Sequence, residues 1–132
     1  MKRGLEKIAP RFKLWLESGK TASVFGDGKW RLLNAINQTG SLSAAAEKLG
    51  ISYRKAWGDI RNAEGALKVK LLDRHRGGKE GGRTRLTEEG KRWLREYGRF
   101  QAAVDKAVRA GYQDWLGRMQ TAREGTAGEK GA

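Results

Sequence analysis

Two short helical stretches separated by a three-residue turn that begins with glycine constrain this fold more than any other feature of the sequence. In GSLSAAAEKLGISYRKAW, residues 40–57, a serine precedes each predicted helix, 42–49 and 53–67, and Gly50 lies between them. Serine caps helix N-termini, and glycine adopts the left-handed conformation that ends a helix. The pattern predicts a helix-turn-helix, in which the second helix enters the major groove of DNA.

The second predicted helix has one apolar side and one polar side. At about 100° per residue, Ala56, Ile60 and Ala63 fall together on the apolar side. The opposite side combines cations with asparagine, and arginine and asparagine form paired hydrogen bonds with guanine and adenine edges. An ordinary solvated face is the alternative interpretation of any one of these charges. The candidate DNA-binding residues of this helix and its cap are Ser52, Tyr53, Arg54, Lys55, Gly58, Arg61 and Asn62.

A glycine-rich segment between two β-prone runs follows this helix. KLLDR (70–74) and TRL (84–86) flank HRGGKEGGR (75–83), which predicts a two-stranded hairpin. A hairpin in this place is the wing of a winged helix, and its cations and backbone amides can contact phosphates. A solvated loop is the alternative. The candidate wing residues are Arg74, Arg76, Lys79, Arg83 and Arg85.

The segments before the helix-turn-helix predict two helices and a strand. Apolar residues at spacings of three and four indicate an amphipathic helix whose regular part begins at Pro10 and ends at Ser18. A short strand is expected over 21–25, followed by a helix over about 28–39 with Asp27 as its cap. The fold class is therefore mainly α with a small β-hairpin, a winged helix-turn-helix with a long C-terminal helix.

That long helix begins at about Glu88, with Thr87 as its cap. Its apolar seam is longer than a small winged domain can cover, so we expect it to bury this seam against a second copy of the chain. Folding back on its own domain is the alternative. A two-fold dimer would place two recognition helices about one DNA turn, or a multiple, apart, which predicts a palindromic operator. The predicted dimer-interface residues are Phe12, Trp15, Leu16, Trp93, Tyr97, Phe100, Val104, Val108 and Trp115.

These elements divide the chain into four parts. They are an N-terminal helix with a dimer contact, 1–19, a winged helix-turn-helix domain, 20–86, a dimerisation helix, 87–116, and a tail, 117–132. The tail is rich in small and polar residues, which predicts disorder.

The composition restricts both partners and chemistry. The 132 residues include 28 Lys and Arg against 15 Asp and Glu, and the net charge of +13 favours a polyanionic partner, nucleic acid before an anionic membrane surface. The absence of cysteine excludes disulfides, thiolate metal sites and cysteine nucleophiles. The sequence shows neither a secretory signal nor an apolar run of about 20 residues, so we expect a soluble cytoplasmic protein.

No catalytic constellation is recognisable in the sequence. The one histidine, His75, lies among the cations of the predicted wing, and no carboxylate pair or nucleophile–base pair has a suitable spacing. We therefore expect no enzymatic activity and no metal or cofactor. Two other classes remain open: a sequence-neutral architectural nucleic-acid-binding protein, and an interaction module that has lost DNA binding. Asn62 and Gly58 favour base reading over the first of these.

Three motifs together resemble the N-terminal DNA-binding domain of the ModE-type molybdate-responsive transcription regulators. They are GISY followed by AW within 50–57, GGK at 77–79 and LTxxG at 86–90. AAAEKLGIS is also shared with LysR-type regulators. The resemblance covers about residues 21–113 and implies a winged helix that dimerises through flanking helices. The whole regulators add a C-terminal molybdate-binding region that this sequence is too short to hold, so we expect a stand-alone DNA-binding half without molybdate binding.

Overall fold

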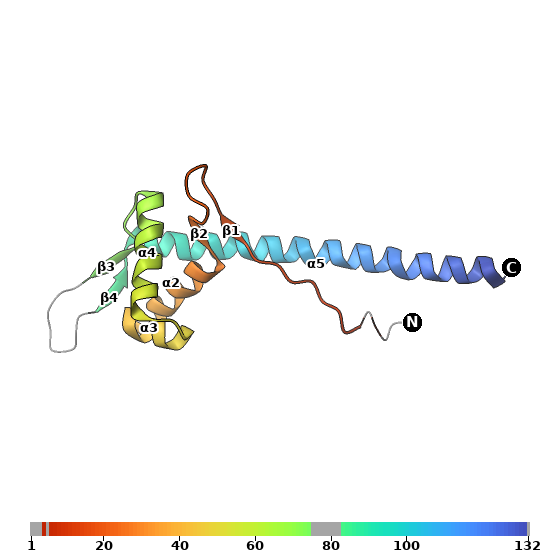
Figure 1. The fold of residues 1–132 in the computed structure, drawn as a ribbon, viewed down its shortest axis with the longest axis horizontal. Coiled ribbons are helices and arrows are strands. Elements are labelled where there is room, and N and C mark those ends of the chain that lie inside the picture. Colours follow the sequence, from red (N-terminus) through yellow and green to blue (C-terminus); the bar gives the residue numbers. More distant parts are fainter. Residues whose placement is uncertain (1–3, 5, 75–82, 132) are drawn as a thin grey trace. The chain divides into compact units, whose positions relative to one another are not determined.

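The computed structural model describes residue 4, residues 6–74 and residues 83–131. The chain forms two compact units, residues 13–99 and residues 1–12 with 100–132, and the last helix contributes to both. The elements in chain order are β1 (Trp15–Leu16), β2 (Phe25–Gly26), α2 (Asp27–Thr39), α3 (Leu42–Leu49), α4 (Tyr53–Leu67), β3 (Leu72–Arg74), β4 (Thr84–Leu86) and α5 (Glu88–Gly131) (Figure 1).

The helix-turn-helix forms with the predicted bounds and caps. The Ser41 hydroxyl accepts a hydrogen bond of 3.0 Å from the amide of Ala44 at the start of α3. Gly50 ends α3 in the left-handed region, at φ 69°. The Ser52 hydroxyl accepts a bond of 3.0 Å from the amide of Lys55 at the start of α4. Local sequence alone therefore determines where both helices begin and where the first one ends.

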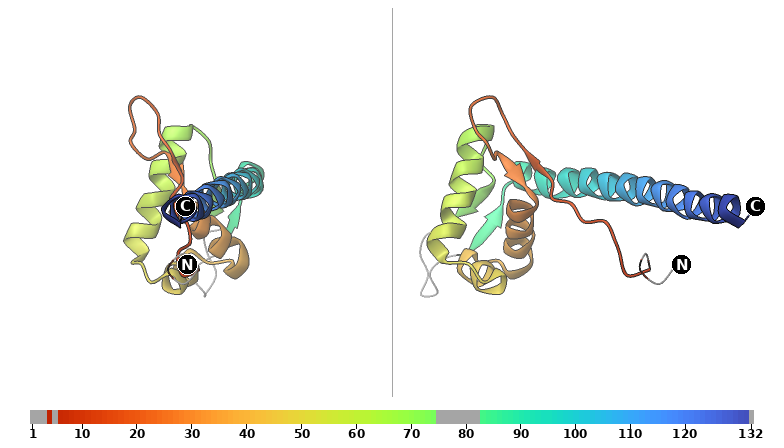
Figure 2. Two further views of the ribbon diagram at one scale, coloured as in Figure 1. Left: turned by 90° about the vertical axis from the view of Figure 1, so that its right-hand side faces the viewer. Right: turned by 45° about the vertical axis from the view of Figure 1, so that its right-hand side comes forward.

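Helices α2, α3 and α4 enclose the core of the 13–99 unit, with the β3–β4 hairpin beside them (Figure 2). Buried alanines on α3 and α4 have no side chain beyond Cβ, so the helix backbones can approach closely. The core includes Phe25, Leu32, Leu33, Ile36, Leu42, Ala45, Ala46, Ala56, Ile60, Ala63 and Leu71.

The predicted N-terminal helix from Pro10 to Ser18 is wrong. Residues 8–14 have no regular secondary structure, and β1 pairs antiparallel with β2. Side chains alternate here with a period of two, because Phe12, Leu14 and Leu16 are half-buried while the residues between them are exposed. The sequence RFKLWLE fits both the three-and-four spacing of a helix and the alternation of a strand. Pairing with β2 selects the strand.

The segment before α2 also differs from expectation. Only Phe25 of the strand predicted over 21–25 is in β2. Gly26 is the N-cap of α2 and makes no side-chain cap bond, so the prediction that Asp27 caps this helix is wrong. Asp27 lies in the first turn, where its Oδ1 accepts a 2.7 Å bond from the hydroxyl of Tyr97 and its Oδ2 accepts a 3.2 Å bond from the amide of Leu14. The carboxylate binds distant parts of the chain instead of capping its own helix.

The hairpin is attached to the end of α2. Gly40 ends that helix at φ 72°, and its carbonyl oxygen accepts a 3.0 Å bond from the amide of buried Thr84. Strands β3 and β4 pair antiparallel, with Leu72 opposite Leu86. The two strands confirm the predicted hairpin, while its tip, residues 75–82, lies outside the described residues.

The LTxxG motif begins α5 and attaches it to β3. The Thr87 hydroxyl accepts a 3.0 Å bond from the amide of Gly90, which confirms the predicted cap, and donates to the carbonyl of Lys70 at 2.5 Å. A Cβ added at Gly90 would overlap the carbonyl oxygen of Leu71. The glycine is therefore required by the close approach of two backbones.

Helix α5 extends through Gly117 to Gly131, into the tail over 117–132 whose disorder stays a prediction. A single glycine costs a helix only about 1 kcal/mol, and good helix formers such as Arg118 and Met119 follow it. Within the residues that the structure describes, no helix is both long and apolar enough to cross a membrane.

Candidate nucleic-acid interface

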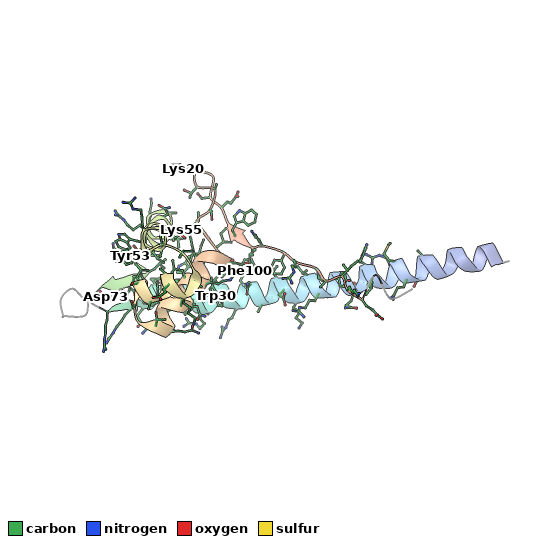
Figure 3. All side chains as sticks on the ribbon, turned by 60° about the horizontal axis from the view of Figure 1, so that its bottom comes forward. Lys20, Trp30, Tyr53, Lys55, Asp73 and Phe100 are labelled. Carbon is green, nitrogen blue, oxygen red and sulfur yellow. The ribbon has the colours of Figure 1, made fainter. Side chains whose placement is uncertain are left out.

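The polar face of α4 is exposed, as its sequence predicts. Tyr53 is 50% exposed at the start of the helix, and the side chains of Arg54, Lys55, Arg61 and Asn62 are all exposed (Figure 3 labels Tyr53 and Lys55). A flat, cationic helix face of this kind can approach the edges of base pairs.

Gly58 lies on the same face with open space around it. A Cβ added there would meet no atom within 4 Å, so the packing of the domain does not require a glycine. Its absence of a side chain instead lets another surface approach the α4 backbone closely.

Two contacts orient the cations of this face. The Lys55 ammonium lies 3.3 Å from Oδ2 of Asp59, one helical turn later. On the other flank, Cζ of Arg61 lies 5.7 Å from the centroid of the half-buried Trp57 ring. A cation above an aromatic ring is attracted by its face, while the N–H groups stay in the guanidinium plane and can still donate.

A third cation, Lys29 of α2, lies near this face. Its Nζ donates to the carbonyl oxygens of Ser23 at 2.9 Å and Val24 at 3.4 Å. Burial lowers the pKa of Lys29; the Asp59 carboxylate raises it and the Lys55 ammonium lowers it further. Sequence reasoning did not select Lys29 or Asp59, although the i,i+4 spacing of Lys55 and Asp59 is a signal for an ion pair.

Glu64 joins α4 to the hairpin. Its Oε2 accepts hydrogen bonds from the amides of Leu71 at 2.8 Å and Leu72 at 3.2 Å. Lys68 ends α4 in the left-handed region at φ 58°, the only non-glycine residue with positive φ among those described, which turns the chain toward β3. One carboxylate therefore fixes the start of the wing relative to the predicted recognition helix. Sequence reasoning missed Glu64 because the amides that donate to its carboxylate lie beyond the end of α4.

The described part of the wing carries two exposed arginines, Arg83 and Arg85, and Arg85 pairs in register with Asp73. Arg74 lies in β3. The other predicted wing residues, Arg76 and Lys79, belong to the tip outside the described residues. Among the described residues no group of three or more histidine or acidic side chains is placed to hold a metal ion.

Three residues of the predicted dimer interface pack on their own domain, two of them in the first turns of α5. Tyr97 is 3% exposed, and Trp93 has its ring centroid 5.0 Å from that of Phe25. Leu16 also packs against the core. Trp30 binds the same stretch of α5, because its Nε1 donates to the carbonyl of residue 94 at 2.8 Å (Figure 3). The aromatic rings here cover one another within a single chain.

The remaining predicted dimer residues leave apolar surface accessible. Phe100 is 45% exposed and Trp115 is 39% exposed on α5. Val104 and Val108 of the same helix are partly exposed, as is Phe12, and Trp15 is 51% exposed. In the unit formed by residues 1–12 and 100–132, the Tyr112 hydroxyl donates to the carbonyl of Ile8 at 2.8 Å.

Proteins of related sequence share the helix-turn-helix region. Residues 28–91 match the model of the bacterial regulatory helix-turn-helix proteins of the LysR family. The chain is 37% identical over 89 residues to the molybdenum-pterin-binding protein MopB of Rhodobacter capsulatus, with 67% of this chain and 33% of that protein covered. It is 38% identical over 76 residues to the transcriptional regulator ModE of Yersinia pestis, with 58% and 29% covered. The chain spans about a third of the length of such relatives.

Solved structures share the fold. The BenM DNA-binding domain in complex with benA site 1 DNA superimposes with a TM-score of 0.52 at 26% identity, covering 65% of this chain and 91% of that one. The CbnR DNA-binding domain in complex with DNA gives 0.50 at 22% identity, which shows the fold alone. The winged helix-turn-helix and the resemblance to ModE-type and LysR-type proteins are thereby confirmed. Two of the relatives are named as transcriptional regulators, ModE of Yersinia pestis and the dual regulator ModE of Escherichia coli.

Proposed function

We propose that this chain, which carries a helix-turn-helix domain of the LysR and ModE type, is a transcription regulator that binds double-stranded DNA sequence-specifically as a homodimer. The observation that carries the proposal is the exposed cationic face of α4, held by Ser52 at its start and joined to the wing by Glu64. A helix so supported can enter the major groove without reordering the domain.

The proposed contacts divide into base reading and phosphate binding. Arg54 and Lys55 lie in the first turn of α4, and Asn62 follows about two turns later on the same face. We propose that these three side chains reach base edges. Phosphates are contacted mainly by the wing and by the edges of the α4 face. These contacts set the register of the protein on the duplex. The proposed DNA-binding set remains Ser52, Tyr53, Arg54, Lys55, Gly58, Arg61, Asn62, Arg74, Arg76, Lys79, Arg83 and Arg85.

The proposed dimer interface is narrower than the set expected from sequence. Tyr97 belongs to the domain's buried core, and Leu16 and Trp93 are partly buried against it. The proposed interface therefore centres on the accessible apolar residues of α5: Phe100, Val104, Val108 and Trp115. Phe12 and Trp15 remain in the proposed set of dimer-interface residues. Two copies related by a two-fold axis would present two α4 helices to half-sites about one DNA turn, or a multiple, apart.

Selection of bound duplexes from a random-sequence DNA pool near physiological salt tests the proposal. A palindromic motif with half-sites about one turn apart is expected. Binding that selects no motif and disappears as salt rises would instead indicate a sequence-neutral architectural protein. The molybdenum compounds in the names of the relatives belong to those longer proteins and do not enter this proposal.

A further inference from the structure

One carboxylate lies beside the cations of the proposed DNA-binding face. Asp59 follows Lys55 by one turn of α4, and its side chain is 28% exposed where that of Lys55 is 61% exposed. Lys29 approaches from α2, held by the carbonyl oxygens of residues 23 and 24. Asp59 is thus an acidic group paired with Lys55 at the edge of a face that is otherwise cationic or neutral.

Stability does not account for an acidic residue in this place. Exposed ion pairs at this spacing contribute little to folding and are screened by salt. The chain makes a pair of the same kind in α5, where Arg109 Nε lies 2.9 Å from Asp105 Oδ2. The pair in α4 differs in its position, because its carboxylate borders the residues proposed to meet DNA.

We propose that Asp59 is a specificity-determining residue of the α4 face, which weakens binding to unmatched duplexes and accepts a hydrogen bond from a cytosine amino group in the matched site. The inference rests on the proposed function and deepens it. Cytosine presents its N4 amino group in the major groove, and an aspartate is a side chain that accepts from it.

The physical reason is the sign of the charge. Any duplex that docks on α4 brings phosphates toward the Asp59 carboxylate, and like charges repel. A cytosine amino group at the right position offsets this cost with a hydrogen bond, whereas guanine and thymine present only acceptors or a methyl group in the major groove. Lys55 remains paired to Asp59 in the absence of a matched site, which reduces its attraction for phosphates of any sequence.

The variant Asp59→Asn tests this inference because it keeps the side-chain shape and removes the charge. The full-length variant and the wild type are each used to select duplexes from the random-sequence pool, and their affinities for the selected duplex and for the unselected pool are compared. Asp105→Asn is the matched control, since it makes the same change of charge in an i,i+4 ion pair of α5. Thermal unfolding of all three proteins is measured in parallel.

For Asp59→Asn we expect a motif that tolerates other bases at one position in each half-site. Its affinity for the unselected pool rises, and the ratio of selected to unselected affinity falls about fivefold, the lower end of the effect of one mismatched base pair. The control is expected to keep the wild-type motif and ratio.

Two results would overturn the assignment of Asp59. One is a wild-type motif with the same affinity ratio as the control. The other is an equal loss of both affinities with a lowered melting temperature, which indicates a structural role. A wild-type protein that selects no motif contradicts the proposed function as well, so the two failures are distinguishable.

Discussion

The hydroxyl group of Tyr97 donates a 2.7 Å hydrogen bond to Oδ1 of Asp27, which joins α5 to the start of α2 across 70 positions of the chain. The same hydroxyl oxygen lies 3.0 Å from the carbonyl oxygen of Leu14, and the amide of Leu14 binds the other carboxylate oxygen. Three segments that are distant in sequence therefore meet at one carboxylate. This contact holds the first turns of α5 to the rest of the unit formed by residues 13–99.

Replacing Tyr97 with phenylalanine removes the hydrogen bond and leaves the ring. We expect the free energy of unfolding to fall by about 1.5–3 kcal/mol, the range for a hydrogen bond to a charged partner. Tyr112→Phe is the control, because its hydroxyl binds the neutral carbonyl of Ile8 in an exposed position. Urea denaturation measures both, and equal effects of the two substitutions would contradict the role given to Asp27.

The stabilisation by Tyr97 depends on pH. Its pKa is raised above the usual value by burial, and then by the hydrogen bond and charge of Asp27. Because the pKa is higher in the folded state, the stabilisation is fully present below the unfolded-state pKa of about 10 and is lost as the pH rises above it. The difference in unfolding free energy between wild type and Tyr97→Phe should therefore be constant between about pH 7 and 9 and shrink above about pH 10. An undiminished difference at about pH 11 would show that the folded-state pKa is not raised.

Gly90→Ala inserts a methyl group where α5 meets the backbone of Leu71, just before β3. The added Cβ would overlap the carbonyl oxygen of Leu71, so we expect a loss of about 1–3 kcal/mol of unfolding free energy. Gly111→Ala lies in the same helix with no atom within 4 Å of the new Cβ, and should stabilise by up to about 1 kcal/mol. Thermal or denaturant unfolding measures both. Stabilisation by both substitutions would mean that the close approach of α5 to Leu71 does not exist.

Arg54→Ala combined with Lys55→Ala removes two proposed base-reading cations from α4. We expect the affinity for a selected duplex to fall at least about tenfold more than the affinity for unselected duplexes. Lys106→Ala with Arg118→Ala makes the same change of charge on α5, and should lower the two affinities equally or not at all. Fluorescence anisotropy at several salt concentrations measures these effects. An unchanged ratio for the α4 variant would remove Arg54 and Lys55 from the recognition set.

Val104→Glu places a charge in the proposed dimer interface. Val104 is partly exposed on α5, while its neighbour Ala103 is exposed, so Ala103→Glu serves as the control. We expect the first variant to be monomeric in sedimentation experiments and the second to be dimeric, because burial of an unpaired charge opposes association. Two dimeric variants, or a monomeric wild type, would contradict the proposed interface.

Local sequence by itself determined the helix-turn-helix. Ser41, Gly50 and Ser52 act on amides and dihedral angles within a few residues of themselves, so α3 and α4 begin and end where the pattern predicts. The start of α5 at Glu88 with its Thr87 cap and the strands of the hairpin were predictable for the same reason. The cationic face of α4 follows directly from helical periodicity once those bounds are known.

Tertiary structure alone decided the features that depend on a distant partner. The segment around Phe12 and Leu16 fits the spacing of a helix as well as that of a strand, and pairing with β2 selects the strand. Asp27 is a residue type that often caps helices. Its carboxylate instead accepts hydrogen bonds from the hydroxyl of Tyr97 and the amide of Leu14. Glu64 and Gly90 read as ordinary helix residues until the backbone of Leu71 lies against them. Contacts between groups far apart in sequence leave no local pattern, since the entropy of closing such loops is offset only in the assembled core.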